Sequence, residues 1–415
     1  MLKNLSLVIK NPKIIGKNIV NQESSFFLFF LSLLTSKRKP HAHFFNLRII
    51  MFNPNSNFIF KRSGVQSKNR TVLAAMTNKQ SFENGTISKD EINWLSRRAQ
   101  GGFGIITTAA THISKYGQGW EGEFGLFDDK FIPSLSKLTH SIHHYNGLVF
   151  AQLFHGGIRS PEHLTGMQPI SADKVECKES KSGFSKKASQ NDINRIIKEF
   201  TSAAVRCVDA GFDGVELHGA HGYLISQFLS KSINKRKDKW GGDVKGRSRF
   251  LFEIFKSIRR HVPEKFIVGI RLSPEIQGLG ISLGDSIELV KKMSQLDVDF
   301  IHLSCWDIYA HSSEYPKNSK RLTEWFTRSI QNIPPIIITG NIWSSRDAQN
   351  AMAQGADLIG VARAAIPYPD WANNIIDSKY DPPRGPFTSK QLKKAQLSDV
   401  FINYMRKWEG FVVDK

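Results

Sequence analysis

The chain has 415 residues, of which 40% are hydrophobic and 23% are charged, as in ordinary globular proteins and unlike disordered or collagenous chains. It carries 57 Lys and Arg against 37 Asp and Glu, a net charge of +20, so nucleic acid or an anionic surface has to be weighed as a partner. The three cysteines, Cys177, Cys207 and Cys305, lie far apart and give no support to a disulfide framework, a cysteine-rich zinc site or an iron–sulfur cluster.

Residues 1–50 differ from the rest of the chain. They hold eight Lys and Arg and one acid, Glu23, so +7 of the +20 lies there and +13 remains. The apolar run at 26–34 has nine residues, about half of the roughly 20 that cross a bilayer as a helix. Because the globular pattern begins only after Met51, we expect residues 1–50 to be an unstructured extension. It is an organellar targeting segment, a secretory signal or, as we favour, a stretch upstream of a start at Met51 in a cytoplasmic protein.

Short apolar runs rich in β-branched residues alternate with amphipathic stretches of helical length from about residue 70 onward. We expect strands at 71–76, 104–108, 148–154, 214–217, 266–272, 300–304, 335–339 and 358–362. We expect helices between them at 89–100, 132–145, 192–210, 248–261, 286–296, 321–331 and 344–354. Eight strands interleaved with helices over about 300 residues predict an α/β fold, a (β/α)8 TIM barrel, which we place at 51–376.

A tail at 377–415 follows the expected barrel. Within 392–408 its apolar residues recur at helical spacing, which predicts a short helix that docks on the barrel of the same chain rather than on a second subunit. The sequence does not decide between a monomer and a homo-oligomer.

In such a barrel the chemistry belongs to the loops at the carboxyl ends of the strands. Polar or turn-forming residues lie at several of these ends: Gln152, His155, His218, His221, Tyr223, Arg271, Gly340, Asn341 and Arg363. We expect all of them to face one mouth. The long Ser- and Lys-rich segment at 155–190 is expected to be a lid or specificity loop, with a solvated surface loop as an equal alternative.

Two positions near the end of the barrel indicate a phosphate site. Gly340 and Asn341 follow the seventh expected strand and Arg363 follows the eighth, where barrels place backbone N–H groups around a phosphate. A phosphorylated cofactor fits this arrangement. The alternative is that Gly340 only turns the chain and Arg363 pairs with a surface acid.

The segment HGAHGYL at 218–224 places two imidazoles and a phenol on a glycine-rich turn. Imidazole N–H groups stabilise a developing enolate oxygen, and a tyrosine O–H beside them can act as a general acid. Zinc held by Glu216, His218 and His221 competes with this interpretation, although strand alternation aims Glu216 and His218 at one face while the turn redirects His221. Two structural histidines are the other alternative, and we expect no metal.

Arg271 ends an expected buried strand, where a guanidinium is costly unless it meets an anion or an electron-rich ring. A flavin would supply such a ring. The amide of Gln152 can match the donors and acceptors of the flavin pyrimidine edge, and Arg271 can stabilise negative charge near N1.

With these residues assembled, the chain resembles the old yellow enzyme family of FMN-dependent NAD(P)H oxidoreductases from about residue 69 to 368. The matching stretches are NRTVLAAMT at 69–77, QLFHGG at 152–157, HGAHGYL at 218–224, the region 227–250 and the region 340–363. The resemblance implies a barrel that binds FMN non-covalently. It also implies NADPH or NADH as the reductant and a small activated alkene, such as an α,β-unsaturated carbonyl compound, as the substrate.

Carried over by position, the resemblance implies that FMN is bound by Ala74, Ala75, Thr77, Ala110, Gln152, Arg271, Gly340, Asn341, Ala362 and Arg363. His218 and His221 would bind the substrate carbonyl oxygen. A hydride would pass from flavin N5 to the β carbon while Tyr223 protonates the α carbon. Two positions depart from the family pattern, because Ala75 stands where proline is common and Ala362 where glycine is common.

Two other functions were compared with this one. A tRNA dihydrouridine synthase is also an FMN barrel, and a nucleic-acid substrate would explain the net charge of +13 outside residues 1–50. Such an enzyme is expected to use a cysteine as an acid after its third strand, where this chain has His155-Gly156-Gly157. A catalytically silent flavin-binding protein is disfavoured by the intact set of His218, His221, Tyr223 and Arg271. We therefore expect an ene-reductase with neither a nucleic-acid partner nor a membrane partner.

Overall fold

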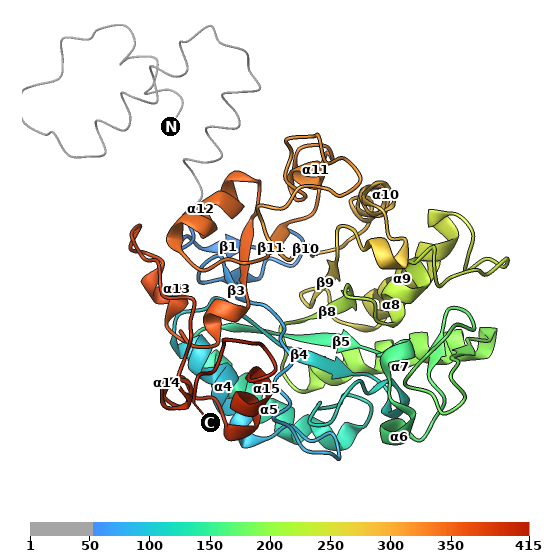
Figure 1. The fold of residues 1–415 in the computed structure, drawn as a ribbon, viewed down its shortest axis with the longest axis horizontal. Helices are drawn as coiled ribbons and strands as arrows, with labels where there is room; N and C mark the ends of the chain where they lie inside the picture. The colour runs from blue at the N-terminus through green and yellow to red at the C-terminus, as the bar shows by residue number, and fades with distance from the viewer. Residues whose placement is uncertain (1–52, 415) are drawn as a thin grey trace, which may run out of the picture. The chain divides into compact units, whose positions relative to one another are not determined.

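The computed structural model describes residues 53–414, and its centre is a closed barrel of eight parallel strands with helices around the outside (Figure 1). In barrel order the strands are β10 (Phe300–Ser304), β11 (Ile336–Thr339), β12 (Leu358–Val361), β3 (Thr71–Leu73), β4 (Ile105–His112), β5 (Leu148–Phe154), β8 (Gly214–Gly219) and β9 (Ile267–Leu272). The predicted (β/α)8 barrel is confirmed. All eight expected strands form, and the expectations on residues 1–50 lie outside the described residues.

The helices that cover the barrel each bury one apolar face. They are α4 (Lys89–Gln100), α5 (Ile132–His143), α7 (Gln190–Asp209), α9 (Val244–His261), α10 (Leu283–Met293), α11 (Glu324–Thr327) and α12 (Ser345–Ala353). Helix α11 is shorter than the predicted 321–331. The helix ends at Thr327, where the chain turns and the backbone N–H groups of Ser329 and Ile330 both donate to the carbonyl of Phe326.

One end of the barrel is closed by aromatic packing. An antiparallel pair of two-residue strands, β1 (Phe58–Ile59) and β2 (Gln66–Ser67), precedes the barrel and was not predicted, because strands this short carry no periodic signal. Phe60 follows β1 and lies 6.1 Å from the ring of Phe150 and 6.3 Å from that of Phe300, whose rings stack on each other. Phe300 begins its strand, so this plug fills the amino-terminal end and leaves the carboxyl end for chemistry.

The segment after the third barrel strand is a structured excursion. It contains the 3-10 turn η3 (Gly157–Arg159), the helix α6 (Glu162–Thr165) and two short parallel strands, β6 (Ile170–Ser171) and β7 (Lys186–Lys187). Gln227 of α8 (Leu224–Leu229) fixes its root, because the amide accepts from the backbone N–H of Ile158 and donates to the carbonyl of Gly222. The segment is thereby tied to the turn that carries the candidate histidines.

After the short α13 (Trp371–Asn374), the tail packs against α4 of the same chain, where Figure 1 shows α14 and α15 beside that helix. The expected single helix at 392–408 is two helices, α14 (Ser389–Lys394) and α15 (Asp399–Met405), because Gln396 adopts a left-handed φ of 64° between them. Phe401 is fully buried, and its ring centroid lies 5.4 Å from that of Trp94. Across 53–414, no helix is both long enough and apolar enough to span a membrane.

Candidate active site

The two histidines and the tyrosine of the HGAHGYL segment come together at the carboxyl end of β8. The ring of His218 lies 5.0 Å from the ring of His221 and 5.0 Å from that of Tyr223. The chain folds this tightly because His221 and Gly222 both have left-handed backbones, with φ of 62° and 80°. Such a conformation is unfavourable for a histidine and is common at functional sites.

Both imidazoles are held in the neutral form. Burial lowers the pKa of His218 and of His221 well below the ordinary value, and the positive charges of Arg271 and Arg159 lower it further. The Nδ1 atom of His218 accepts the backbone N–H of Ala220 at 3.4 Å, which assigns the ring proton to Nε2. The pair therefore offers N–H donors at neutral pH without carrying charge.

The phenol of Tyr223 is packed between aromatic rings and a cation. Its ring lies 4.5 Å from Phe154 and 6.4 Å from Trp120, and the guanidinium of Arg159 lies 4.2 Å from its centroid. Arg159 also donates to the carbonyl of His221 at 3.1 Å. Burial raises the pKa of Tyr223 above its ordinary value, against the opposing charge of Arg159. Arg159 and Trp120 were not predicted from the sequence, because one exposed cation and one aromatic residue on loops carry no pattern.

Arg271 lies on β9, at the position paired with His218 of β8. Its Nη1 donates to the carbonyl of Ala75 at 3.2 Å and its Nη2 to Oγ of Ser304 at 3.0 Å. Oγ of Ser304 also lies 2.8 Å from Nε2 of His221, so one hydroxyl links the guanidinium to this imidazole. The Nε atom of Arg271 is buried and has no hydrogen-bond partner among the described residues.

The remaining residues of the expected pyrimidine end lie on neighbouring strands. Ala110 pairs with Gln152 across β4 and β5, next to a register shift that begins at Thr107. The backbone N–H of Ala74 donates to Val361 at 2.9 Å, which joins the ends of β3 and β12. Thr77 follows β3, half-buried, and the hydroxyl of Tyr404 from α15 hydrogen-bonds to it. The tail thus reaches the mouth of its own barrel.

The expected phosphate residues form a second cluster at the ends of β11 and β12. Asn341 has a left-handed φ of 52°, and its Oδ1 accepts from Nη2 of Arg363 at 3.1 Å. A Cβ atom on Gly340 would lie 2.5 Å from the carbonyl oxygen of Cys305, so only glycine fits there. Arg363 is exposed and forms no ion pair within residues 53–414, unlike the alternative in which it meets a surface acid. Ala362 precedes it, half-buried.

His155 does not join the site. Its Nδ1 accepts the backbone N–H of Gly157, its ring packs beneath Gly117, and burial lowers its pKa to about 3. It is a neutral structural residue that shapes the root of the 155–190 segment.

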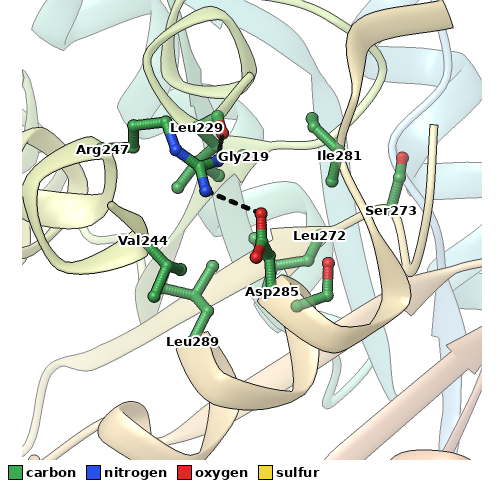
Figure 2. A pocket seen from close by; sticks show the side chains of 10 residues that line it. Gly219, Leu229, Val244, Arg247, Leu272, Ser273, Ile281, Asp285 and Leu289 are labelled. Carbon is green, nitrogen blue, oxygen red and sulfur yellow. Dashed lines mark hydrogen bonds and ion pairs between the residues drawn. The ribbon is translucent and has the colours of Figure 1, made fainter. Parts of the chain in front are cut away.

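Two arginines of the region 227–250, Arg236 and Arg247, are structural as well. Arg236 donates to the carbonyls of Ala172 and Ala188, which anchors the far end of the same segment. Figure 2 shows Arg247 in a pocket lined by α8, α9, β9 and α10, where its guanidinium points to Asp285 at 2.7 Å. This pocket lies between helices and holds an ion pair.

Glu216 does not share a ligand set with the two histidines. Its carboxylate accepts from Nε2 of Gln152 at 2.6 Å and lies 2.6 Å from Nδ1 of His302. Throughout residues 53–414, no group of three or more His, Cys, Asp and Glu side chains is arranged to hold a metal ion.

Comparison with known proteins identifies a flavoenzyme pattern. The model of the NADH:flavin oxidoreductase / NADH oxidase family matches residues 58–381. The chain is 31% identical over 334 residues to a probable NADH-dependent flavin oxidoreductase, YqiG, of Bacillus subtilis, covering 79% of this chain and 88% of that protein. It is 33% identical over 328 residues to an NADH:acrylate oxidoreductase of Vibrio harveyi, covering 77% of this chain but only 32% of that protein. The chain thus spans about a third of this relative's length.

Among solved structures, the old yellow enzyme homologue from Zymomonas mobilis superimposes with a TM-score of 0.70 at 25% identity, covering 82% of this chain and 96% of that one. The residues described above fit a flavin nucleotide. The unpartnered Nε of Arg271 is a donor for an electron-rich ring, and Gln152 supplies an amide beside it. The backbone at Gly340 and the guanidinium of Arg363 suit a phosphate.

Proposed function

The chain belongs to the NADH:flavin oxidoreductase / NADH oxidase family, which includes the old yellow enzymes, and we propose that it reduces the activated C=C bond of α,β-unsaturated carbonyl compounds. As a member of this family it is an oxidoreductase that uses FMN and NADH or NADPH. FMN, when bound, takes reducing equivalents from the nicotinamide and passes them to the alkene. The proposal concerns the substrate class and the roles of individual side chains.

The observation that carries the proposal is the packing of two neutral imidazoles and one protonated phenol against one another at the carboxyl end of β8. His218 and His221 are 5.0 Å apart, and Tyr223 is 5.0 Å from His218. Two neighbouring imidazole N–H donors suit a carbonyl whose oxygen gains negative charge as the conjugated double bond is reduced. Because both imidazoles are neutral, they donate hydrogen bonds without surrendering a proton to the oxygen.

Tyr223 is proposed to supply the proton for the α carbon. Burial raises its pKa, so the phenol is fully protonated at neutral pH and is ready to donate. The guanidinium of Arg159, 4.2 Å from the ring centroid, stabilises the phenolate that remains after the transfer. Arg159 also holds the carbonyl of His221, and it therefore couples the acid to the turn that carries the oxyanion donors.

The ten expected FMN residues are proposed to act as two groups. Ala74, Ala75, Thr77, Ala110, Gln152 and Arg271 would surround the ring, and Gly340, Asn341, Ala362 and Arg363 would bind the phosphate. Support comes from the orphaned Nε of Arg271 and from the Arg363–Asn341 hydrogen bond at 3.1 Å. The barrel at 51–376 is proposed as the catalytic unit, and the tail at 377–415 as a segment that packs against it.

The test is an absorption spectrum of the purified protein, before and after anaerobic NADPH or NADH and then cyclohexenone. The proposal expects flavin bands that bleach with the nicotinamide and return with the enone. A flavin that bleaches but is not reoxidised by the enone would refute the proposed substrate class. A protein that neither contains nor takes up FMN would overturn the assignment of the site.

A further inference from the structure

A chain of four polar side chains crosses the barrel interior below the candidate flavin site. Glu216 on β8 accepts from Nε2 of Gln152 on β5 at 2.6 Å, and its other oxygen lies 2.6 Å from Nδ1 of His302 on β10. Nε2 of His302 lies 2.6 Å from Oγ1 of Thr339 on β11. All four side chains are buried, and Glu216 and His302 are fully so. Four strands of the barrel are therefore joined by one hydrogen-bonded relay.

The relay has one consistent protonation pattern. Burial by itself would raise the pKa of Glu216, but His302, Arg271 and the hydrogen bonds outweigh it and hold the pKa below its ordinary value. Burial lowers the pKa of His302 despite the nearby carboxylate. Glu216 is thus an anion and His302 is neutral, with Nδ1–H donating to the carboxylate and Nε2 accepting from the hydroxyl of Thr339.

Strand β12 leaves room for this relay at Gly360. A Cβ atom on Gly360 would lie 1.8 Å from Oγ1 of Thr339 and 3.1 Å from Nε2 of His302. Glu216 and His302 stand on β8 and β10, and the intervening strand β9 has Gly269 at the position paired with Glu216. Gly360 therefore leaves the space that the relay occupies, whereas a Cβ atom on Gly269 would lie 2.1 Å from the ring of Phe300, so that glycine makes room for the aromatic plug.

The first consequence concerns the amide of Gln152. A carboxylate can only accept, so the hydrogen bond to Glu216 assigns the NH2 group of Gln152 to that side. The carbonyl oxygen of Gln152, which forms no hydrogen bond within the described residues, is left to accept from a ligand. A flavin presents one ring N–H at its pyrimidine edge, which is the donor that such a carbonyl requires.

The second consequence concerns charge. Arg271 stands two residues after Gly269 on β9, and the negative charge of Glu216 acts on it directly. Arg271 stabilises negative charge on a reduced flavin ring, and a buried anion beside it offsets part of that stabilisation. Glu216 therefore limits how much more tightly the site binds reduced FMN than oxidised FMN.

We propose that Glu216, held by His302 and Thr339, is a positioning residue that fixes the Gln152 amide for FMN and sets the redox potential of the bound flavin through Arg271. The proposal deepens the FMN site of the proposed function and rests on it. Glu216 touches neither substrate nor cofactor in this account and acts only through Gln152 and Arg271.

The experiment compares Glu216→Gln with the wild type in the full chain, by FMN titration of the apoprotein and by potentiometric titration of the FMN-loaded protein. The variant keeps the size of the side chain but removes its charge and lets the Gln152 amide turn over. We expect oxidised FMN to bind about tenfold more weakly while reduced FMN binds as before. Through the thermodynamic cycle this raises the midpoint potential by about 30 mV for a two-electron couple.

Two further variants keep the test decisive. Glu216→Asp retains the charge but is one methylene too short for Gln152, so FMN binding weakens with less change in potential. Asp299→Asn is the matched control, because Asp299 is a buried carboxylate paired with Arg62 and Arg259 at the opposite end of the barrel. It should reduce stability and leave both the FMN dissociation constant and the potential unchanged.

The outcomes separate the two levels of the argument. A wild-type protein that takes up no FMN refutes the proposed function itself. A wild-type protein that binds FMN, together with a folded Glu216→Gln variant of unchanged affinity and potential, refutes only the positioning role. If Glu216→Gln does not fold, unchanged FMN affinity in Glu216→Asp refutes it instead. Equal shifts in Asp299→Asn would also refute it, because they would attribute the effect to lost stability.

Discussion

Replacing Tyr223 by phenylalanine should separate the two half-reactions of the enzyme. The substitution keeps the ring, and with it the contacts to Phe154 at 4.5 Å and His218 at 5.0 Å, so packing is preserved and only the proposed proton donor is lost. A positioned general acid contributes about 10²- to 10⁴-fold to a rate, which corresponds to roughly 3 to 5 kcal/mol of transition-state stabilisation. Reduction of the enone should slow by that factor. Reduction of the bound flavin by NADPH should remain within about twofold of wild type, since that step needs no proton from the phenol.

The assay is anaerobic stopped-flow absorbance, with flavin bleaching by NADPH and flavin recovery on mixing with cyclohexenone followed separately. Tyr145→Phe is the matched control, because Tyr145 follows α5 just before β5 begins and so lies at the closed end of the barrel. It should leave both rates unchanged. Equal losses in both half-reactions of Tyr223→Phe would indicate a disturbed flavin site, and no loss in either would place the proton donor elsewhere.

Three further results are expected. Arg363→Ala should weaken FMN binding by roughly tenfold to a hundredfold, as expected for the loss of a charge-assisted phosphate contact, and unchanged flavin content after gel filtration would remove Arg363 from the phosphate site. Burial raises the pKa of Glu91 to about 7, so the folded state keeps a proton on this carboxyl that the unfolded state releases. The stability that the protonated Glu91 contributes is therefore lost as the pH rises from about 4.5 through 7. Between pH 5 and pH 8 the free energy of unfolding of Glu91→Gln, measured in urea, should therefore rise by about 3 kcal/mol relative to that of the wild type. A difference in unfolding free energy that does not change with pH would contradict this. Phe401→Ala should cost about 3 to 5 kcal/mol by emptying the contact of the tail with α4, whereas Val400→Ala, at an exposed position of the same helix, should change stability by less than about 0.5 kcal/mol.

The strands could be predicted because a parallel barrel buries them on both sides, which makes them continuous apolar runs. The runs at 148–154 and 300–304 match β5 and β10 at both ends. In the tail, the difference between prediction and structure comes from one residue with a left-handed backbone. Gln396 splits the predicted helix at 392–408 in two. Such a conformation depends on tertiary contacts and leaves no periodic signal in the sequence.

The residues of the candidate site also differ in whether the sequence could predict them. Residues at or just after the carboxyl ends of strands were predicted, because chain order alone brings these ends of parallel strands to one rim. His218, Tyr223 and Arg271 are of this kind. Arg159 and Tyr404 were missed, because each reaches the rim from a segment whose path is set by docking rather than by strand order.

The relay below the site marks what a single sequence can and cannot reveal about buried polar residues. His302 stands in the middle of the apolar run FIHLS, and an imidazole there is too costly to bury without partners, so the sequence alone implies that partners exist. It does not identify them, because Glu216 is 86 residues away and the same alternation that points it into the barrel also made it a candidate metal ligand. Only closure of the barrel brings the carboxylate to Gln152 on one side and to His302 on the other. A polar residue inside a barrel strand is therefore best examined together with the residues at the same height on the neighbouring strands, since these are the partners that can satisfy it.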